Sequence, residues 1–281
     1  MERIKVDTSI FFSKPEKPDY IPPIIALKNL RQIFNEGKSG EYRLFDNFNL
    51  EIEDSPNKSE LISIVGGSGC GKSQILKVIA GLSKVQSGDV EIFGRPRKEY
   101  GSIPMVFQTY SNYEWMTVLE NVMLPMTIKG IPKKEAREKA IEFIQQVGLE
   151  DHLNKYAKHS ILSGGQLQRV SIARSLACDS KIILLDEATG ALDIKMKREV
   201  QGIIQKIGYT SEKTIINVTH SVEEAVFLST KIIILLPKPC RIYKTLDIDF
   251  GEGPRERNII GTDKFNMYLG ELTRALEEVC V

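Results

Sequence analysis

The segment "LISIVGGSGCGKSQILKVIAGL" (residues 61–82) decides the fold, because it joins an apolar run, a glycine-rich loop and a stretch with helical periodicity. The run 61–65 predicts a buried strand, and the stretch that begins at Lys72 predicts a helix. The loop between them, "GGSGCGKS" (66–73), fits the pattern G-x-x-x-x-G-K-[ST]. A chance glycine-rich turn is the alternative interpretation, and the flanking strand and helix argue against it.

Each part of this loop has a physical task in holding a nucleoside triphosphate. Glycines let successive N–H groups turn inward and surround phosphate oxygens, and the helix N-terminus adds partial positive charge. Lys72 brings a charge to the β- and γ-phosphates, and the Ser73 hydroxyl is a candidate ligand for Mg²⁺. The predicted nucleotide-binding residues of the loop are Gly66, Gly67, Ser68, Gly69, Cys70, Gly71, Lys72 and Ser73. Alkylation of the Cys70 thiol is expected to block nucleotide entry.

Apolar strand patterns alternate with helical patterns downstream of the loop. "KIILL" (181–185) precedes a helical pattern near 194–207, and "TIINVT" (214–219) and "KIIILL" (231–236) follow. Such continuous runs are typical of strands that are buried on both faces of a parallel sheet. Upstream, "IIALKNL" (24–30) and "EYRLFDNFNLEI" (41–52) alternate like antiparallel strands. We therefore predict an α/β fold, with a P-loop NTPase core, a mostly parallel sheet and N-terminal antiparallel β strands.

The chain divides into three predicted parts. Residues 1–23 contain several prolines and predict an extended N-terminal arm. Residues 24–252 form the α/β domain, into which a helical lobe at about 109–178 is inserted, because no strong strand pattern interrupts that region. Residues 253–281 form a tail in which 262–279 has the periodicity of an amphipathic helix.

Composition excludes several classes of protein. Thirty-eight basic and 37 acidic residues leave a formal charge of +1, so no field of the whole chain favours nucleic acid. The longest apolar run, "IIILL", is far shorter than the roughly 18–20 residues of a spanning helix. The N-terminus lacks the apolar core of a signal peptide, so we expect a cytoplasmic protein. The four cysteines match no metal-site or disulfide spacing and are expected to be reduced.

Two adjacent carboxylates end the strand pattern "IILLDE" (182–187). Ligands of open α/β sheets bind at the carboxyl ends of the strands, and neighbouring side chains point to opposite faces. Asp186 is therefore predicted to hold Mg²⁺, and Glu187 to polarise the water that attacks the γ-phosphate. The alternative is that both acids only solubilise the surface.

Two further polar side chains follow apolar runs. His220 closes "TIINVTH" at the carboxyl end of a strand, and we predict that it contacts the γ-phosphate rather than serving as a buried structural histidine. Gln108, in "MVFQTY" (105–110), is predicted to sense the attacking water or to join the Mg²⁺ ligands. The predicted catalytic residues are thus Glu187, His220 and Gln108, and the predicted metal ligands are Ser73, Gln108 and Asp186.

The stretch "ILSGGQLQRV" (161–170) places Ser163 and Gln166 at the spacing of a capping box. The residues between them are Gly164 and Gly165, and glycine in the first turn of a helix costs about 0.5–1 kcal/mol relative to alanine. Such a cost indicates that bare backbone is needed, as at an anion-binding helix start.

Taken together, these motifs resemble the ATP-binding subunit of ABC transporters over roughly residues 24–240. The chain shows, in the order of that family, a Walker A-like "GGSGCGKS", a Q-loop-like "FQ" (107–108), a signature-like "LSGGQ" (162–166), a Walker B-like "IILLDE", a D-loop-like "ALD" (191–193) and a switch histidine-like "VTH" (218–220). The resemblance implies an ABC-type ATPase that binds ATP and Mg²⁺. It also places Phe34 where the family stacks an aromatic ring on adenine, although a core phenylalanine would look the same.

The resemblance further implies an assembly. Two copies, or this chain and a related ATPase, would face head to tail, so that Ser163, Gly164, Gly165 and Gln166 bind the nucleotide of the partner chain. A transmembrane permease would be the direct partner, and its coupling helix would lie in a cleft near residues 110–114 of this chain. An extracytoplasmic solute-binding protein would be an indirect partner. The chain would then lie peripherally on the cytoplasmic side of the membrane, with no nucleic acid partner.

Some residues narrow the resemblance, and others depart from it. "FQTYSNYEWMTVLENV" (107–122) and "FLSTKIIILLPKPCRI" (227–242) resemble ATPases that import nitrate, sulfonate or taurine. Gln74 stands where threonine or serine is usual, but its carboxamide can still donate to an α-phosphate oxygen. Ala188 replaces a usual proline, and the turn 53–60 is longer than usual.

Two other functions remain as alternatives. A soluble ABC-type ATPase that acts on ribosomes or DNA would normally contain two ATPase modules or a long coiled-coil insertion. A non-catalytic regulator or scaffold would not need Lys72, Asp186, Glu187 and His220 together. We expect transport, and the sequence leaves the solute open.

Overall fold

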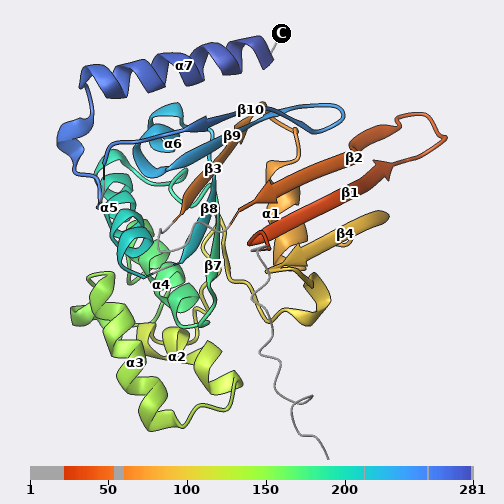
Figure 1. Cartoon of the computed structure of the whole chain (residues 1–281). Helices are drawn as coiled ribbons and strands as arrows, with labels where there is room; N and C mark the ends of the chain where they lie inside the picture. The colour runs from red at the N-terminus through yellow and green to blue at the C-terminus, as the bar shows by residue number, and fades with distance from the viewer. Residues whose placement is uncertain (1–21, 54–59, 212, 252, 280–281) are drawn as a thin grey trace, which may run out of the picture.

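The computed structural model describes residues 22–53, 60–211, 213–251 and 253–279. These residues form two sheets with helices around them (Figure 1). The strands are β1 (Ile25–Phe34), β2 (Tyr42–Ile52), β3 (Leu61–Gly66), β4 (Ser87–Ile92), β5 (Arg95–Pro96), β6 (Met105–Val106), β7 (Ile182–Asp186), β8 (Thr214–Val218), β9 (Lys231–Leu236) and β10 (Arg241–Asp247). The α-helices are α1 (Lys72–Ala80), α2 (Val118–Ile128), α3 (Lys133–Gln146), α4 (Gly164–Leu176), α5 (Ile194–Thr210), α6 (Val222–Leu228) and α7 (Asp263–Val279).

The larger sheet has the strand order β10-β9-β3-β8-β7-β6. All neighbouring strands from β9 to β6 run parallel, and β10 pairs antiparallel with β9 at the edge. This confirms the predicted α/β fold with a mostly parallel sheet. β3, β8 and β7 are adjacent parallel strands in the middle of the sheet. Their carboxyl ends therefore bring residues 66, 186 and 218 together at one end of these strands.

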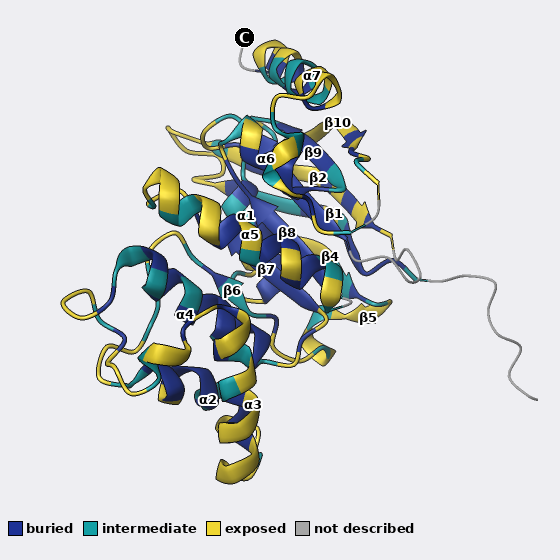
Figure 2. Cartoon of the chain, turned by 90° about the vertical axis from the view of Figure 1, so that its left-hand side faces the viewer, coloured by how far each residue is buried: buried dark blue, intermediate teal, exposed yellow. Residues whose placement is uncertain are grey.

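The central strands are apolar along their whole length because both of their faces are covered. In β3, Leu61 and Val65 belong to one core cluster, whereas Ile62 and Ile64 belong to the other. The side-chain period of two therefore divides each strand between two cores. Figure 2 shows the buried band of this sheet at β8 and β7.

The smaller sheet is antiparallel, with the order β2-β1-β4-β5. The antiparallel pairing of β1 with β2 confirms the prediction from their alternating patterns. The sequence did not indicate β4, since only Ile92 of this strand is buried and a mostly exposed strand has little hydrophobic periodicity. This sheet and α1 pack around the second core cluster, the one that contains Ile62 and Ile64.

The region between β6 and β7 is helical, and α2, α3 and α4 pack against one another there (Figure 1). Buried residues of all three helices, including Val122, Ala140 and Val170, belong to the first core cluster. The domain limits proposed from the sequence stay a prediction, and residues 1–21 of the predicted arm lie outside the described residues.

The last helix, α7, contacts α6 and β9 and buries Phe265, Leu272, Ala275 and Val279. These residues recur with the helical period that the sequence shows for 262–279. None of the helices in the described ranges is long and apolar enough to cross a bilayer.

Candidate active site

The loop between β3 and α1 is built around Lys72. Gly71, the residue before α1, has φ 102°, a left-handed backbone that suits glycine. The Lys72 side chain is buried, and its ammonium donates to the carbonyl oxygens of Gly66 and Gly67, both at 2.9 Å. The charge therefore lies against the loop backbone, where the motif predicts phosphate.

Ser73 and Asp186 meet at this loop. The Ser73 hydroxyl donates to Asp186 Oδ1 at 2.8 Å, which joins the start of α1 to the end of β7. Burial raises the pKa of Asp186, although the Ser73 hydrogen bond acts in the opposite direction. A bound cation would offset the free-energy cost of burying this carboxylate in its charged form.

The Ser73 hydroxyl and the Asp186 carboxylate are oxygen groups that fit Mg²⁺, which usually takes one or two protein ligands together with phosphates and water. Among the described residues, no cluster of three or more acidic, histidine or cysteine side chains is arranged to hold a metal by itself. A metal here would therefore have to bind together with the nucleotide.

Glu187 and His220 form a direct pair. His220 Nε2 lies 2.6 Å from Glu187 Oε1, and both side chains are partly exposed. Glu187 has φ 50°, an uncommon backbone for a residue other than glycine, and its N–H donates to the Val218 carbonyl at 2.9 Å. The two predicted catalytic side chains thus come together from the ends of β7 and β8.

Gln108 lies beside the turn that follows Glu187. Its Nε2 would be 3.5 Å from a Cβ atom built on Gly190, and the Gly190 N–H donates to the Glu187 carbonyl at 2.9 Å. Gln108, the third predicted catalytic residue, therefore lies next to the turn that follows Glu187.

The signature-like stretch begins α4 with the predicted capping box. Gln166 N–H donates to Ser163 Oγ at 3.3 Å, and Ser163 N–H donates to Gln166 Oε1 at 2.9 Å, which confirms the prediction. Gln166 also contacts His152, with 2.8 Å between the two Nε2 atoms, a contact that the sequence did not indicate.

Side chains of the same chain cover both glycines of this stretch. A Cβ atom on Gly165 would lie 3.0 Å from Met196 Cβ, and the Gly165 N–H donates to Met196 Sδ at 3.3 Å. A Cβ atom on Gly164 would collide with the Tyr110 hydroxyl. Both glycines therefore already have a packing reason within the single chain.

Within the described part of the chain, no hydrogen bond joins residues 163–166 to the loop 66–73. The two predicted halves of the nucleotide site thus have separate sets of partners. This separation is what an arrangement shared between two chains would require.

An aromatic pair adjoins the loop. Phe34 is 45 % exposed and stacks on Tyr42, with 6.2 Å between ring centroids. The Tyr42 hydroxyl donates to the Gly69 carbonyl at 2.5 Å, which ties the pair to the phosphate loop. Tyr42 was missed in the sequence, where only its position at the start of an aromatic-containing strand could have indicated it.

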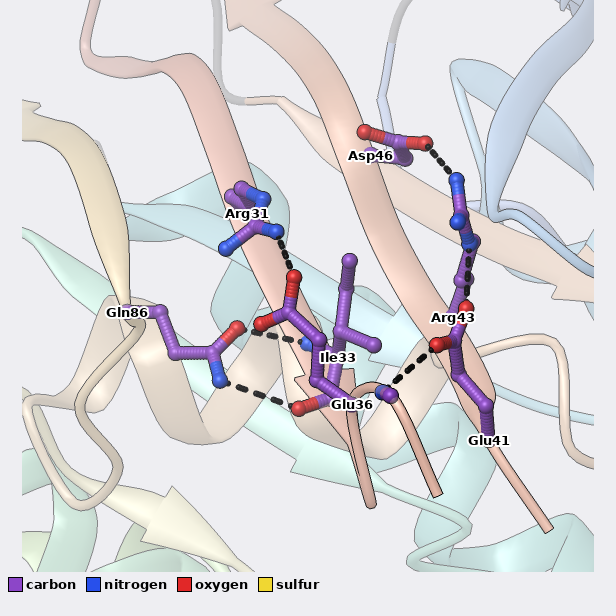
Figure 3. Close-up of polar contacts among 8 residues, drawn as sticks. Arg31, Ile33, Glu36, Glu41, Arg43, Asp46 and Gln86 are labelled. Carbon is purple, nitrogen blue, oxygen red and sulfur yellow. Dashed lines mark hydrogen bonds and ion pairs between the residues drawn. The ribbon is translucent and has the colours of Figure 1, made fainter. Parts of the chain in front are cut away.

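Polar contacts fix the strand end that carries Phe34. Gln86 accepts from the Ile33 N–H at 2.8 Å and donates to the Ile33 carbonyl at 3.0 Å (Figure 3). In the same view, Arg31 of β1 pairs with Glu36, which lies beyond the end of that strand. The two Gln86 bonds thus fix the backbone of Ile33, the residue that precedes Phe34.

Gln74 is already engaged within the chain. Its amide nitrogen donates to Ser83 Oγ at 2.6 Å, so the predicted bond to an α-phosphate would need its second N–H or a rotation of the side chain. The role proposed for Gln74 stays a prediction.

The Cys70 thiol does not open to the solvent. Cys70 is 1 % exposed and its sulfur lies 3.8 Å from the Lys72 ammonium. Cys240 is also buried, and burial strongly raises the pKa of its thiol. The effect of Cys70 alkylation on nucleotide entry stays a prediction, and the burial of the sulfur adds that a reagent reaches it only when the loop opens.

We expect N-ethylmaleimide to label Cys70 and Cys240 at least about tenfold more slowly in the folded chain than in urea, because both reactions require local opening and a thiolate. Mass spectrometry of tryptic peptides at several times measures each rate. Equal rates for folded and unfolded Cys70 would contradict the burial of this side chain.

A cavity of about 270 Å³ adjoins Gln108. It is lined by Gln108, Thr109, Tyr110, Asn112, Glu114, Ala157, His159, Leu167 and Ala191. The cavity coincides with the segment 110–114, where the sequence predicts a cleft for a partner. Tyr110 packs edge-on against His159, with 4.9 Å between ring centroids.

Comparisons with known proteins match most of this chain. A family model described as "ABC transporter" matches residues 46–190. An uncharacterized ABC transporter ATP-binding protein of Methanocaldococcus jannaschii is 41 % identical over 246 residues, which cover 87 % of this chain and 89 % of that protein. A nitrate import ATP-binding protein of Synechocystis is 36 % identical over 261 residues, with 90 % and 94 % coverage.

A solved structure is similar as well. It is a dimeric post-hydrolysis state of an ATP-binding cassette bound to ADP and Pi, with a TM-score of 0.68 and 31 % identity. The match covers 81 % of this chain and 100 % of the cassette.

Proposed function

This chain belongs to the ABC transporter family as an ATP-binding subunit with ATPase activity, and from that premise we propose that it is the motor of an importer. In this proposal, ATP binding and hydrolysis in a dimer drive solute transport through a separate membrane subunit. The observation that carries the proposal is the meeting of two pairs, Ser73 with Asp186 and Glu187 with His220, with Ser73 directly after the buried Lys72.

Each residue then has a part in hydrolysis. Lys72 exchanges its two carbonyl partners for phosphate oxygens. Glu187 orients the attacking water and accepts its proton, while His220 holds the Glu187 carboxylate and reaches toward the γ-phosphate. Ser73 and Asp186 would hold Mg²⁺, which, when bound, neutralises charge on the β- and γ-phosphates. Phe34 supplies an exposed ring for adenine.

The separate location of the signature-like stretch supports the proposed dimer. Ser163 and the N–H groups of Gly164 and Gly165 would face the γ-phosphate bound to the loop of the partner chain. ATP would then favour the closed dimer because it contacts both chains only in that state, and hydrolysis would favour opening.

The cavity beside Gln108 supports the proposed permease contact. Its lining contains an aromatic residue, Tyr110, an acid, Glu114, and Gln108 itself, which lies beside the turn that follows Glu187. A short helix of a membrane subunit seated there would sense movements of Gln108. The peripheral cytoplasmic location follows from such docking.

The proposed solute is a small anion such as nitrate, sulfonate or taurine. Support comes from the relative named for nitrate import and from the resemblance in residues 107–122 and 227–242. A solute-binding protein would reach this chain only through the permease. The copies of the dimer would be identical or closely related ATPases.

Purification of the tagged chain from membranes in mild detergent tests this function. We expect a protein with several spanning helices to copurify, and the ATPase rate of the complex to rise when the anion and its binding protein are added. Copurification of ribosomes or DNA instead, with an ATPase rate that rises with them, would favour the soluble alternative and overturn the proposal.

A further inference from the structure

Glu224 is a buried carboxylate that none of the motifs includes. It lies on α6 and is 4 % exposed. Burial of a carboxylate costs free energy unless it is paired and hydrogen-bonded. Here the Thr189 hydroxyl donates to Oε1 at 2.5 Å, the Thr219 hydroxyl donates to Oε2 at 2.7 Å, and the Lys197 ammonium lies 3.6 Å from Oε2.

The two threonines come from the two segments that carry the catalytic pair. Thr189 lies in the turn that follows Glu187, and Thr219 directly precedes His220. Glu187 and His220 contact each other at 2.6 Å. Besides the Glu187 N–H bond to Val218, two side-chain links therefore join the ends of β7 and β8, the catalytic pair and the Glu224 carboxylate.

The turn after Glu187 needs such support. A left-handed residue other than glycine costs of the order of 1–3 kcal/mol and persists only where the surroundings enforce it. Glu187, with φ 50°, is held by its own N–H bond to Val218, by the Gly190 bond to its carbonyl, and through Thr189 by Glu224. Only the last of these bonds depends on a side chain outside the turn and the strands.

The partners of Glu224 also distinguish it from a simple helix cap. Glu224 is the third residue of α6, where the carboxylate of a capping box would accept the Ser221 N–H, but that N–H donates to Thr219 Oγ1 at 3.1 Å instead. Both hydroxyls that the carboxylate accepts lie outside α6. The carboxylate thus joins α6 to the segments that follow β7 and β8, at the carboxyl ends of the strands where the reaction is expected.

We propose that Glu224 is a positioning residue for ATP hydrolysis, which holds Glu187 and His220 at their working separation through Thr189 and Thr219. It acts without touching the nucleotide. The proposal rests on the proposed function for the reaction that it serves, and it concerns the chemical step rather than ATP binding.

The test compares variants that keep or remove one hydroxyl. Thr189→Val and Thr219→Val preserve side-chain shape but lose the bond to Glu224, and Thr219→Val also loses the acceptor of the Ser221 N–H, so Thr189→Val is the cleaner variant. We expect kcat for ATP to fall about 10- to 100-fold, since a displacement of about 1 Å can cost about 10²-fold. The KM for ATP should stay within about twofold because the loop 66–73 is untouched. Thr189→Ser and Thr219→Ser should restore most of the lost kcat.

A matched control and a double variant complete the test. Thr214 is also buried in β8, at the opposite end from His220, so Thr214→Val should leave kcat unchanged. If Thr189 acts through Glu187, adding Thr189→Val to Glu187→Gln should lower the residual turnover no further. Full kcat in both valine variants, or equal losses in the serine and valine variants, would overturn the proposal. Absence of ATPase activity in the parent chain would instead contradict the proposed function.

Discussion

Replacement of Glu187 by glutamine is expected to lower ATP turnover by about 10²–10⁴-fold, the usual contribution of a general base. Glutamine keeps the shape and can still bond to His220, 2.6 Å from the present carboxylate, but it cannot accept a proton from water. ATP binding should persist, because Lys72, Ser73 and Asp186 are unchanged. Phosphate release in steady state and ATP titration by calorimetry measure the two properties separately.

The same variant should accumulate an ATP-dependent dimer, which light scattering detects, because closure no longer leads to hydrolysis. Glu199→Gln is a suitable control, since this acid lies on α5 and pairs with Arg169 rather than with a predicted catalytic residue. Turnover of Glu187→Gln at the parent rate would show that another group activates the water.

Replacement of Lys72 by methionine should weaken ATP binding by about 30-fold or more, because loss of one member of a buried charge pair costs about 2–5 kcal/mol. The side chain is 5 % exposed and its two carbonyl contacts lie within the phosphate loop. Displacement titration with a fluorescent ATP analogue gives the affinity. The rise in melting temperature that saturating ATP causes should shrink in parallel.

Lys84→Met provides the matched control, because Lys84 is an exposed lysine shortly after α1. Its affinity for ATP should equal that of the parent. Circular dichroism of Lys72→Met without nucleotide separates loss of binding from loss of fold. Parent-like affinity in a folded Lys72→Met chain would contradict the assignment of the phosphate loop.

Much of the fold was predictable because its signals are local. The runs that became β3, β7, β8 and β9 are apolar on both faces, so the sequence shows them without knowledge of their neighbours. The capping box of Ser163 and Gln166 depends on one turn of helix and was equally accessible. The exposed strand β4 offered no such signal.

The predicted site residues were found by motif, and the structure brings Ser73 to Asp186 and Glu187 to His220. The support of these residues was not predictable in the same way. Tyr42 reaches Gly69 from another sheet, and Glu224 reaches Thr189 across a long stretch of chain. Such contacts depend on how distant elements pack, which spacing along one chain does not encode.

The contact between Met196 and the signature-like stretch has a consequence for the proposed dimer. Met196 is partly buried, and its sulfur accepts from the N–H of the buried Gly165. In the dimer, that N–H must leave the sulfur before it can face a phosphate. Loss of this contact disfavours the closed state, so Met196 raises the amount of ATP that is needed to populate it.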